Sequence, residues 1–122
     1  MVQPADIVIK RIYDAPSETD GCRVLVDRLW PRGITKERAR LDEWNRDVAP
    51  STELRKWFGH APERFGEFAK RYREEMSQQR EALEHLREIA ASGRLTLLIA
   101  GKNPEINHAA VLKEILEKEE LL

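Results

Sequence analysis

The sequence predicts an α/β fold in which a small, mainly parallel sheet of three to four strands is flanked by helices. Short β-branched or apolar runs lie at 7–13, 23–28 and 95–100, and amphipathic helical patterns separate the second run from the third. The run at 95–100 is almost entirely apolar, as is typical of a parallel strand covered on both faces. Strands that alternate with helical segments favour layered packing and right-handed crossovers.

Composition and length limit the possible classes of protein. With 122 residues, the chain is expected to form one domain over 1–122. It contains 21 Lys and Arg against 22 Asp and Glu, which argues against the uniformly basic field of a dedicated nucleic-acid-binding protein. Cys22 is the only cysteine, so no internal disulfide is expected. Because no secretory signal and no apolar run of about 20 residues is present, we expect a cytoplasmic protein without a membrane segment.

Three segments in the first half of the chain are expected to be strands, and a fourth is expected to be a loop that connects two of them. Residues 7–13 are rich in β-branched side chains, which fit a pleated sheet. A loop at 14–21, with the Pro, Ser, Asp and Gly residues of turns, leads to the strand at 23–28. Residues 42–48 alternate only weakly between apolar and polar, which indicates a short additional strand.

Capping residues predict where the helices begin and end. Thr35 is a favourable N-cap for a short helix through Arg40, and Ser51 is one for a helix that ends near Gly59. Proline is favoured in the first turn of a helix, so a further helix is expected to begin at Pro62.

The second half of the chain continues the helical pattern up to Gly93. The polar segment 77–79 interrupts this pattern, so two helices with a break at that segment are expected. After the strand at 95–100, a loop at 101–107 leads into a last helix with apolar residues at helical spacing.

Polar side chains follow the strand at 23–28, where the carboxyl end of a parallel strand would lie. Asp27 and Arg28 end this strand, and Trp30 and Arg32 follow it in the loop. Ligands of α/β proteins bind beyond the carboxyl ends of the strands, and the arginine fork matches phosphate or carboxylate groups. The alternative is structural: Asp27 pairs with a neighbouring arginine, while Trp30 packs on the core.

A second polar group follows the strand at 95–100. Asn107 is suited to cap the last helix, and His108 would lie in its first turn, where the helix dipole favours an anion and disfavours a charged imidazole. A neutral His108 could act as a base or proton donor, with Lys102 as a cationic partner. In the structural alternative, His108 forms a local hydrogen bond and Lys102 is solvated.

The two groups lead to two hypotheses of function. In the favoured one, the chain binds an anionic, nucleotide-like small molecule, with or without catalysis. Arg28 and Arg32 are expected to hold the anion, with Lys102 and Asn107 as further ligand-binding residues. Trp30 or Trp44 is expected to stack on the ligand. Asp27 or His108 is expected to transfer a proton. In the other hypothesis, residues 28–40, which hold five basic residues and one acidic residue, contact nucleic acid or an acidic partner without catalysis.

Familiar motifs for metals, cofactors and nucleophiles are missing from the sequence. There is no His-Glu-x-x-His, no Gly-rich phosphate loop and no Gly-x-Ser-x-Gly elbow, so neither a metal nor a cofactor is expected. Cys22 and Arg28 have the Cys-x5-Arg spacing of thiol phosphatases. The residues between them are those of a strand, however, and not the small residues of an oxyanion-binding loop, so this match is rejected.

The segments 26–33, 49–60 and 107–112 contain the motifs Val-Asp-Arg-Leu-Trp-Pro-Arg-Gly, Ala-Pro-Ser with Leu-Arg-Lys-Trp-Phe-Gly-His, and Asn-His-Ala with Val-Leu. In this order they resemble the YeaO-like family of bacterial proteins, which belongs to the domain of unknown function 488. The resemblance implies an α/β domain and a cytoplasmic location, but no particular activity. Larger relatives tend to place a Cys-His-Arg cluster where this chain has Asn107, His108 and Ala109, so only the histidine carries over.

Overall fold

The computed structural model describes residues 6–118 and contains a fully parallel, four-stranded sheet with the order β1-β4-β2-β3. The strands are β1 (Ile7–Arg11), β2 (Cys22–Leu25), β3 (Glu43–Trp44) and β4 (Leu95–Ile99). The helices are α1 (Lys36–Ala39), α2 (Thr52–Phe58), α3 (Phe65–Met76), α4 (Arg80–Ser92) and α5 (His108–Lys118), with 3-10 turns at Glu18–Asp20, Arg46–Val48 and Pro62–Arg64. The predicted α/β fold with a small parallel sheet is confirmed.

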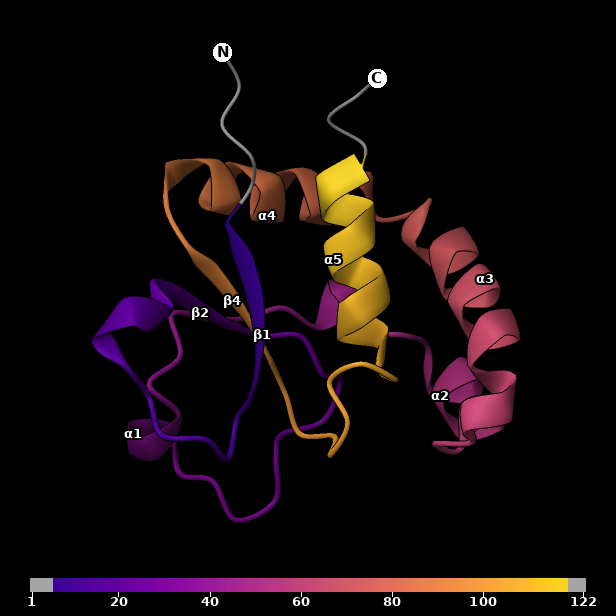
Figure 1. Cartoon of the computed structure of the whole chain (residues 1–122), viewed down its shortest axis with the longest axis horizontal. Coiled ribbons are helices and arrows are strands. Elements are labelled where there is room, and N and C mark those ends of the chain that lie inside the picture. Colours follow the sequence, from indigo (N-terminus) through magenta and orange to yellow (C-terminus); the bar gives the residue numbers. More distant parts are fainter. Residues whose placement is uncertain (1–5, 119–122) are drawn as a thin grey trace.

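The two faces of the sheet are covered differently. Leu97 lies on the face that packs against α2 to α5 and belongs to the larger core. Leu98 lies on the opposite face, in a smaller core against which Trp30 and Trp44 pack. In Figure 1, α5 lies next to the strands, between them and the helices α2 and α3, while α1 lies apart from these helices. Within residues 6–118, no helix is both long and apolar enough to cross a membrane.

The strand β4 lies between β1 and β2, and all five of its residues are buried. This position explains the apolar run in the sequence, because a central parallel strand has no face toward water. Its one polar residue, Thr96, donates a hydrogen bond from Oγ1 to the backbone carbonyl of Asp20 at 2.5 Å. The hydroxyl is therefore satisfied inside the core.

Capping correctly predicted where α1 and α2 begin. The hydroxyls of Thr35 and Ser51 each accept a hydrogen bond, at 3.1 Å, from the backbone N–H three residues later. The predicted break at 77–79 separates α3 from α4, and α4 ends before Gly93 as expected.

Other boundaries differ from the predictions for local reasons. The strand predicted at 42–48 is reduced to Glu43–Trp44, because Arg46–Val48 forms a 3-10 turn. The strand β2 pairs with β3 over two residues only. It ends at Leu25, whereas the predicted strand ended at residue 28. Pro62 begins a 3-10 turn that leads into α3, so the α-helix begins three residues later than predicted.

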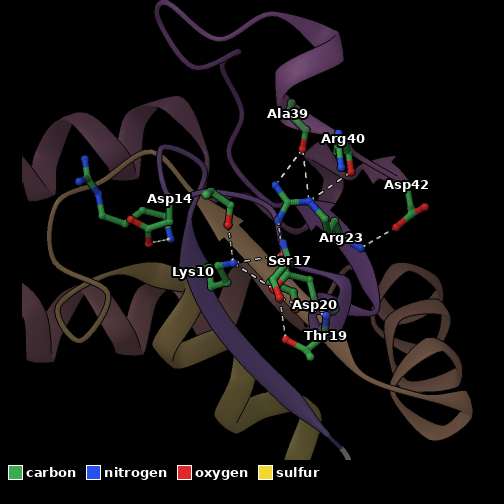
Figure 2. Close-up of polar contacts among 12 residues, drawn as sticks. Lys10, Asp14, Ser17, Thr19, Asp20, Arg23, Ala39, Arg40 and Asp42 are labelled. Atoms are coloured by element: carbon green, nitrogen blue, oxygen red, sulfur yellow. Dashed lines mark hydrogen bonds and ion pairs between the residues drawn. The ribbon is translucent and has the colours of Figure 1, made fainter.

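A buried cluster of charges ties β1 to β2 (Figure 2). The Asp20 carboxylate, in a residue that is 4% exposed, accepts hydrogen bonds from Lys10 Nζ at 3.0 Å, from Arg23 Nη1 at 2.5 Å and from the Ser17 N–H at 3.0 Å. Arg23 also donates to the carbonyl of Ala39 at 2.8 Å. The buried carboxylate and guanidinium are thus paired with each other and with further partners, which is the condition for keeping charges inside a protein.

Candidate functional site

A cavity of about 340 Å³ lies where the loops after β2 and β4 meet, at the carboxyl ends of these parallel strands. Six of the eight predicted site residues line it: Asp27, Arg28, Trp30, Arg32, Asn107 and His108. Much of the remaining wall is aromatic or basic and includes Tyr13, Arg55, Phe58, His60 and Phe68. The structure therefore brings the two predicted polar groups together, in the place where α/β proteins usually hold ligands.

Asp27 and His108 form a buried pair in this cavity. Oδ1 of Asp27 is 3.5 Å from Nε2 of His108, and its Oδ2 accepts a hydrogen bond from the Ala100 N–H at 2.8 Å. Asp27 thus joins the loop after β2 to the end of β4. In the structural alternative Asp27 would pair with an arginine, but its partner is the histidine.

The tautomer of His108 is set by a backbone carbonyl. Nε2 donates a hydrogen bond to the carbonyl of Val26 at 2.9 Å, so the lone pair of a neutral ring is on Nδ1. No described residue bonds to Nδ1, and no buried side-chain nitrogen or oxygen in the described chain lacks a partner. Although His108 as a whole is only 8% exposed, Nδ1 is therefore not fully enclosed, and it is an acceptor at the cavity that His108 lines.

Burial moves the pKa values of this pair toward each other. It lowers the pKa of His108 below 6.5, although the Asp27 carboxylate and the Val26 carbonyl act in the opposite direction. Burial also raises the pKa of Asp27 above 3.8, against the effects of His108, the Ala100 N–H and Arg55. The lowered pKa favours the neutral imidazole at neutral pH.

This arrangement predicts a loss of stability in mild acid. As the pH falls below 6.5, His108 of the unfolded chain binds a proton before that of the folded protein, which favours unfolding. At lower pH, the raised pKa of Asp27 acts in the opposite sense and restores part of the stability. Urea unfolding at about pH 7.5 and about pH 5.5 should show a smaller decline in the free energy of unfolding for His108→Gln than for the wild type. The glutamine amide can still donate to the carbonyl of Val26. Equal declines for both proteins would contradict this interpretation.

The three arginines of the cavity have different surroundings. Arg28 donates to the carbonyls of Pro50 at 3.1 Å and Ala49 at 3.4 Å, so it anchors its loop to the segment before α2. Arg32 and Arg55 are exposed, and their guanidinium groups have no hydrogen-bond or ion-pair partner in the part of the chain that the structure describes. Arg32 and Arg55 are therefore available to an anion.

Two predicted site residues lie outside the cavity. Trp44 packs edge-on against Trp30, with ring centroids 5.3 Å apart, and donates from Nε1 to the carbonyl of Asp27 at 2.7 Å. Trp44 therefore contacts Trp30 and the backbone of Asp27 but does not line the cavity. Lys102 lines an adjoining hollow instead. The expected convergence is thus found for Asp27, Arg32 and His108, but not for Lys102.

Arg55 in the cavity wall was not predicted, and His60, which also lines the cavity, was predicted first as a helix-capping residue and only second as a site residue. Arg55 lies on α2 beside the similar, exposed Lys56, and no local pattern separates the two. Only the docking of α2 against the loop after β2 places Arg55 on the cavity. The sequence does contain one relevant pattern. Leu54 and Phe58 are four residues apart, which predicts the side of α2 that packs inward.

The lining also limits the chemistry. Among the described residues it contains no cysteine, serine, threonine or lysine. The one hydroxyl among these lining residues is that of Tyr13, which donates to the carbonyl of Arg32 at 2.9 Å. Among residues 6–118, no three His, Cys, Asp or Glu side chains are grouped so as to hold a metal ion. Asp27 and His108 remain as a carboxyl and an imidazole able to accept or donate a proton.

Comparison with known proteins identifies the family. The family described as the inactive DUF488-N3 subclade matches residues 6–121. An uncharacterised protein of Mycobacterium tuberculosis is 45% identical over 116 residues, which are 95% of this chain and 98% of the relative. The uncharacterised protein YeaO of Escherichia coli is 45% identical over 111 residues, which are 91% of this chain and 96% of YeaO. No solved structure matches. The chain belongs to the YeaO-like DUF488 family, in the branch described as the inactive DUF488-N3 subclade.

Proposed function

We propose that this protein is a binding module for a small anionic ligand with a planar group, such as a nucleotide. The observation that carries the proposal is the composition of the cavity at the ends of β2 and β4. The guanidinium groups of Arg32 and Arg55 have no hydrogen-bond or ion-pair partner among residues 6–118, and both residues line a partly aromatic hollow that also contains the acceptor Nδ1 of His108. Its volume of about 340 Å³ is in the range of small-molecule sites.

Each part of the cavity matches one part of such a ligand. The forks of Arg32 and Arg55 suit a phosphate or carboxylate, which they would bind through charge-assisted hydrogen bonds. The aromatic side chains offer apolar surface to a planar ring. Nδ1 of His108 accepts a hydrogen bond from an N–H or O–H of the ligand, and Arg28 holds the loop that carries Arg32 in position.

Two observations favour binding over catalysis. Among the described residues, the cavity wall has no cysteine, serine, threonine or lysine. By the family resemblance, Asn107 also stands where larger relatives tend to have a cysteine. The matching family is also described as inactive. We therefore assign the Asp27–His108 pair to ligand recognition, and we keep proton transfer by this pair as the catalytic alternative.

The second hypothesis, contact between residues 28–40 and nucleic acid or an acidic partner, also has support. The side chains of Lys36, Arg38 and Arg40 are all exposed around α1. Binding of this kind would weaken steeply with added salt. The cavity remains the better-supported site, because its charged groups lie around one hollow, whereas Lys36, Arg38 and Arg40 line none of the cavity.

Titration of the protein with adenosine monophosphate tests the proposal. We expect saturable binding of one molecule per chain by calorimetry, with a Kd of about 0.1 mM or tighter and a change in tryptophan fluorescence from Trp30. Adenosine should bind at least about tenfold more weakly, because it lacks the anion. Recovery of the unchanged nucleotide would support binding without turnover. Equal affinities for adenosine and its monophosphate, or no binding of either, would contradict the proposal.

A further inference from the structure

A second hollow of about 460 Å³ adjoins the cavity. The two share part of their walls, namely His60, Ala100, Gly101 and Asn107. Lys102 and Asn103 line only the second hollow. The two hollows are therefore adjacent, with the shared residues between the cavity and Lys102.

Asn107 presents a fixed hydrogen-bond donor to the shared wall. Its Oδ1 accepts a hydrogen bond from the Ala109 N–H at 3.1 Å, so the side chain is held as the cap of α5. The residue is only 9% exposed, and its Nδ2 has no hydrogen-bond partner in the described chain. Because no buried side-chain nitrogen of the described residues lacks a partner, Nδ2 has access to the hollows that Asn107 lines.

Gly101 leaves the space in front of this amide. A Cβ atom at position 101 would lie 2.6 Å from Nδ2 of Asn107, which is closer than real Cβ contacts. Any other residue would push against the amide from the side of the shared wall. Asn107 is fixed as the cap of α5 and position 101 is a glycine, so the donor Nδ2 stays accessible.

The charges around the second hollow favour an anion. Lys102 is exposed, and its ammonium group has no partner among residues 6–118. No carboxylate lines the hollow. His60 adds a ring at the wall between the two spaces, where it packs against Phe58 with ring centroids 6.3 Å apart.

Building on the proposed function, we infer that the ligand carries two anionic groups. The first lies at Arg32 and Arg55 in the cavity, and the second lies in the second hollow, between Nδ2 of Asn107 and the ammonium group of Lys102. The matching chemical class is a nucleoside with two phosphates, either joined in a diphosphate or placed at separate positions of the sugar. The protein would therefore discriminate against nucleoside monophosphates.

Calorimetry with adenosine monophosphate, adenosine diphosphate and adenosine 3′,5′-bisphosphate tests this inference. One of the two ligands with two phosphates should bind the wild type at least about tenfold more tightly than the monophosphate. Which of them does so distinguishes a diphosphate from separate phosphates. Asn107→Asp keeps the oxygen that caps α5 but replaces the donor by a carboxylate, so it should remove this advantage. Lys102→Ala should reduce the advantage about threefold.

The control is Lys70→Ala, which removes the same charge from an exposed position of α3 outside both hollows. It should leave every affinity unchanged, and urea unfolding of Asn107→Asp should show that the cap is intact. If the monophosphate binds as tightly as the other two, or if both site variants behave like the control, the second subsite is refuted while the proposed function stands. If none of the three nucleotides binds the wild type, the proposed function fails and this inference fails with it.

Discussion

Replacing Asp20 by alanine is expected to destabilise the fold by about 3–5 kcal/mol, which is the usual cost of breaking a buried ion pair by removing one partner. The residue is 4% exposed, and its carboxylate binds Lys10, Arg23 and the N–H of Ser17. Arg23 is equally buried and would keep its charge without its carboxylate partner. Burial opposes ionisation of Asp20, but the Ser17 N–H, Lys10 and Arg23 outweigh it and lower the pKa of the carboxyl.

Urea unfolding of the wild type and of Asp20→Ala measures this loss. The matched control is Asp6→Ala, because Asp6 forms an exposed ion pair with Arg94 at 3.2 Å. Its removal should cost about 1 kcal/mol or less. A loss for Asp20→Ala no larger than that of the control would show that the cluster does not hold β1 and β2 together.

The parts of the fold that the sequence predicted well are those that depend on neighbouring residues. The hydroxyls of Thr35 and Ser51 bond to amides within their own first turns, so the caps can be read from the sequence. The strand β4 was equally visible, because a central parallel strand needs apolar residues at nearly every position. The edge strand β3 was predicted within the longer segment 42–48 but without its true bounds, since only two residues pair and their side chains are half-buried.

Features that depend on distant residues were harder to predict. The loop at 14–21 was expected from its turn residues, but nothing local indicates that Asp20 is buried against Arg23 and Lys10. Likewise, Asp27 and His108 were both named, but their pairing depends on β2 and β4 being neighbours in the sheet. Lys102 was expected to join them because it follows the same strand, but its side chain lines the neighbouring hollow.

Replacing Arg32 and Arg55 together by alanine is expected to weaken the binding of adenosine monophosphate at least about 100-fold. Each guanidinium would lose charge-assisted hydrogen bonds to the phosphate, at about 1.5 kcal/mol or more per residue even after screening at the exposed rim. Each single variant should lose about tenfold. If the double variant loses less binding free energy than the two single variants together, both arginines contact the same phosphate oxygens.

The matched control also separates the two hypotheses of function. Lys36→Ala, Arg38→Ala and Arg40→Ala, combined, remove three exposed cations near α1 and outside the cavity. If the cavity is the site, this triple variant binds the nucleotide as the wild type does, while the double variant does not. If residues 28–40 instead contact nucleic acid, the triple variant should lose most of its affinity for a short oligonucleotide and show a weaker salt dependence. The triple variant therefore distinguishes the two hypotheses, because its three cations lie outside the cavity, whereas Arg32 belongs both to the cavity wall and to residues 28–40.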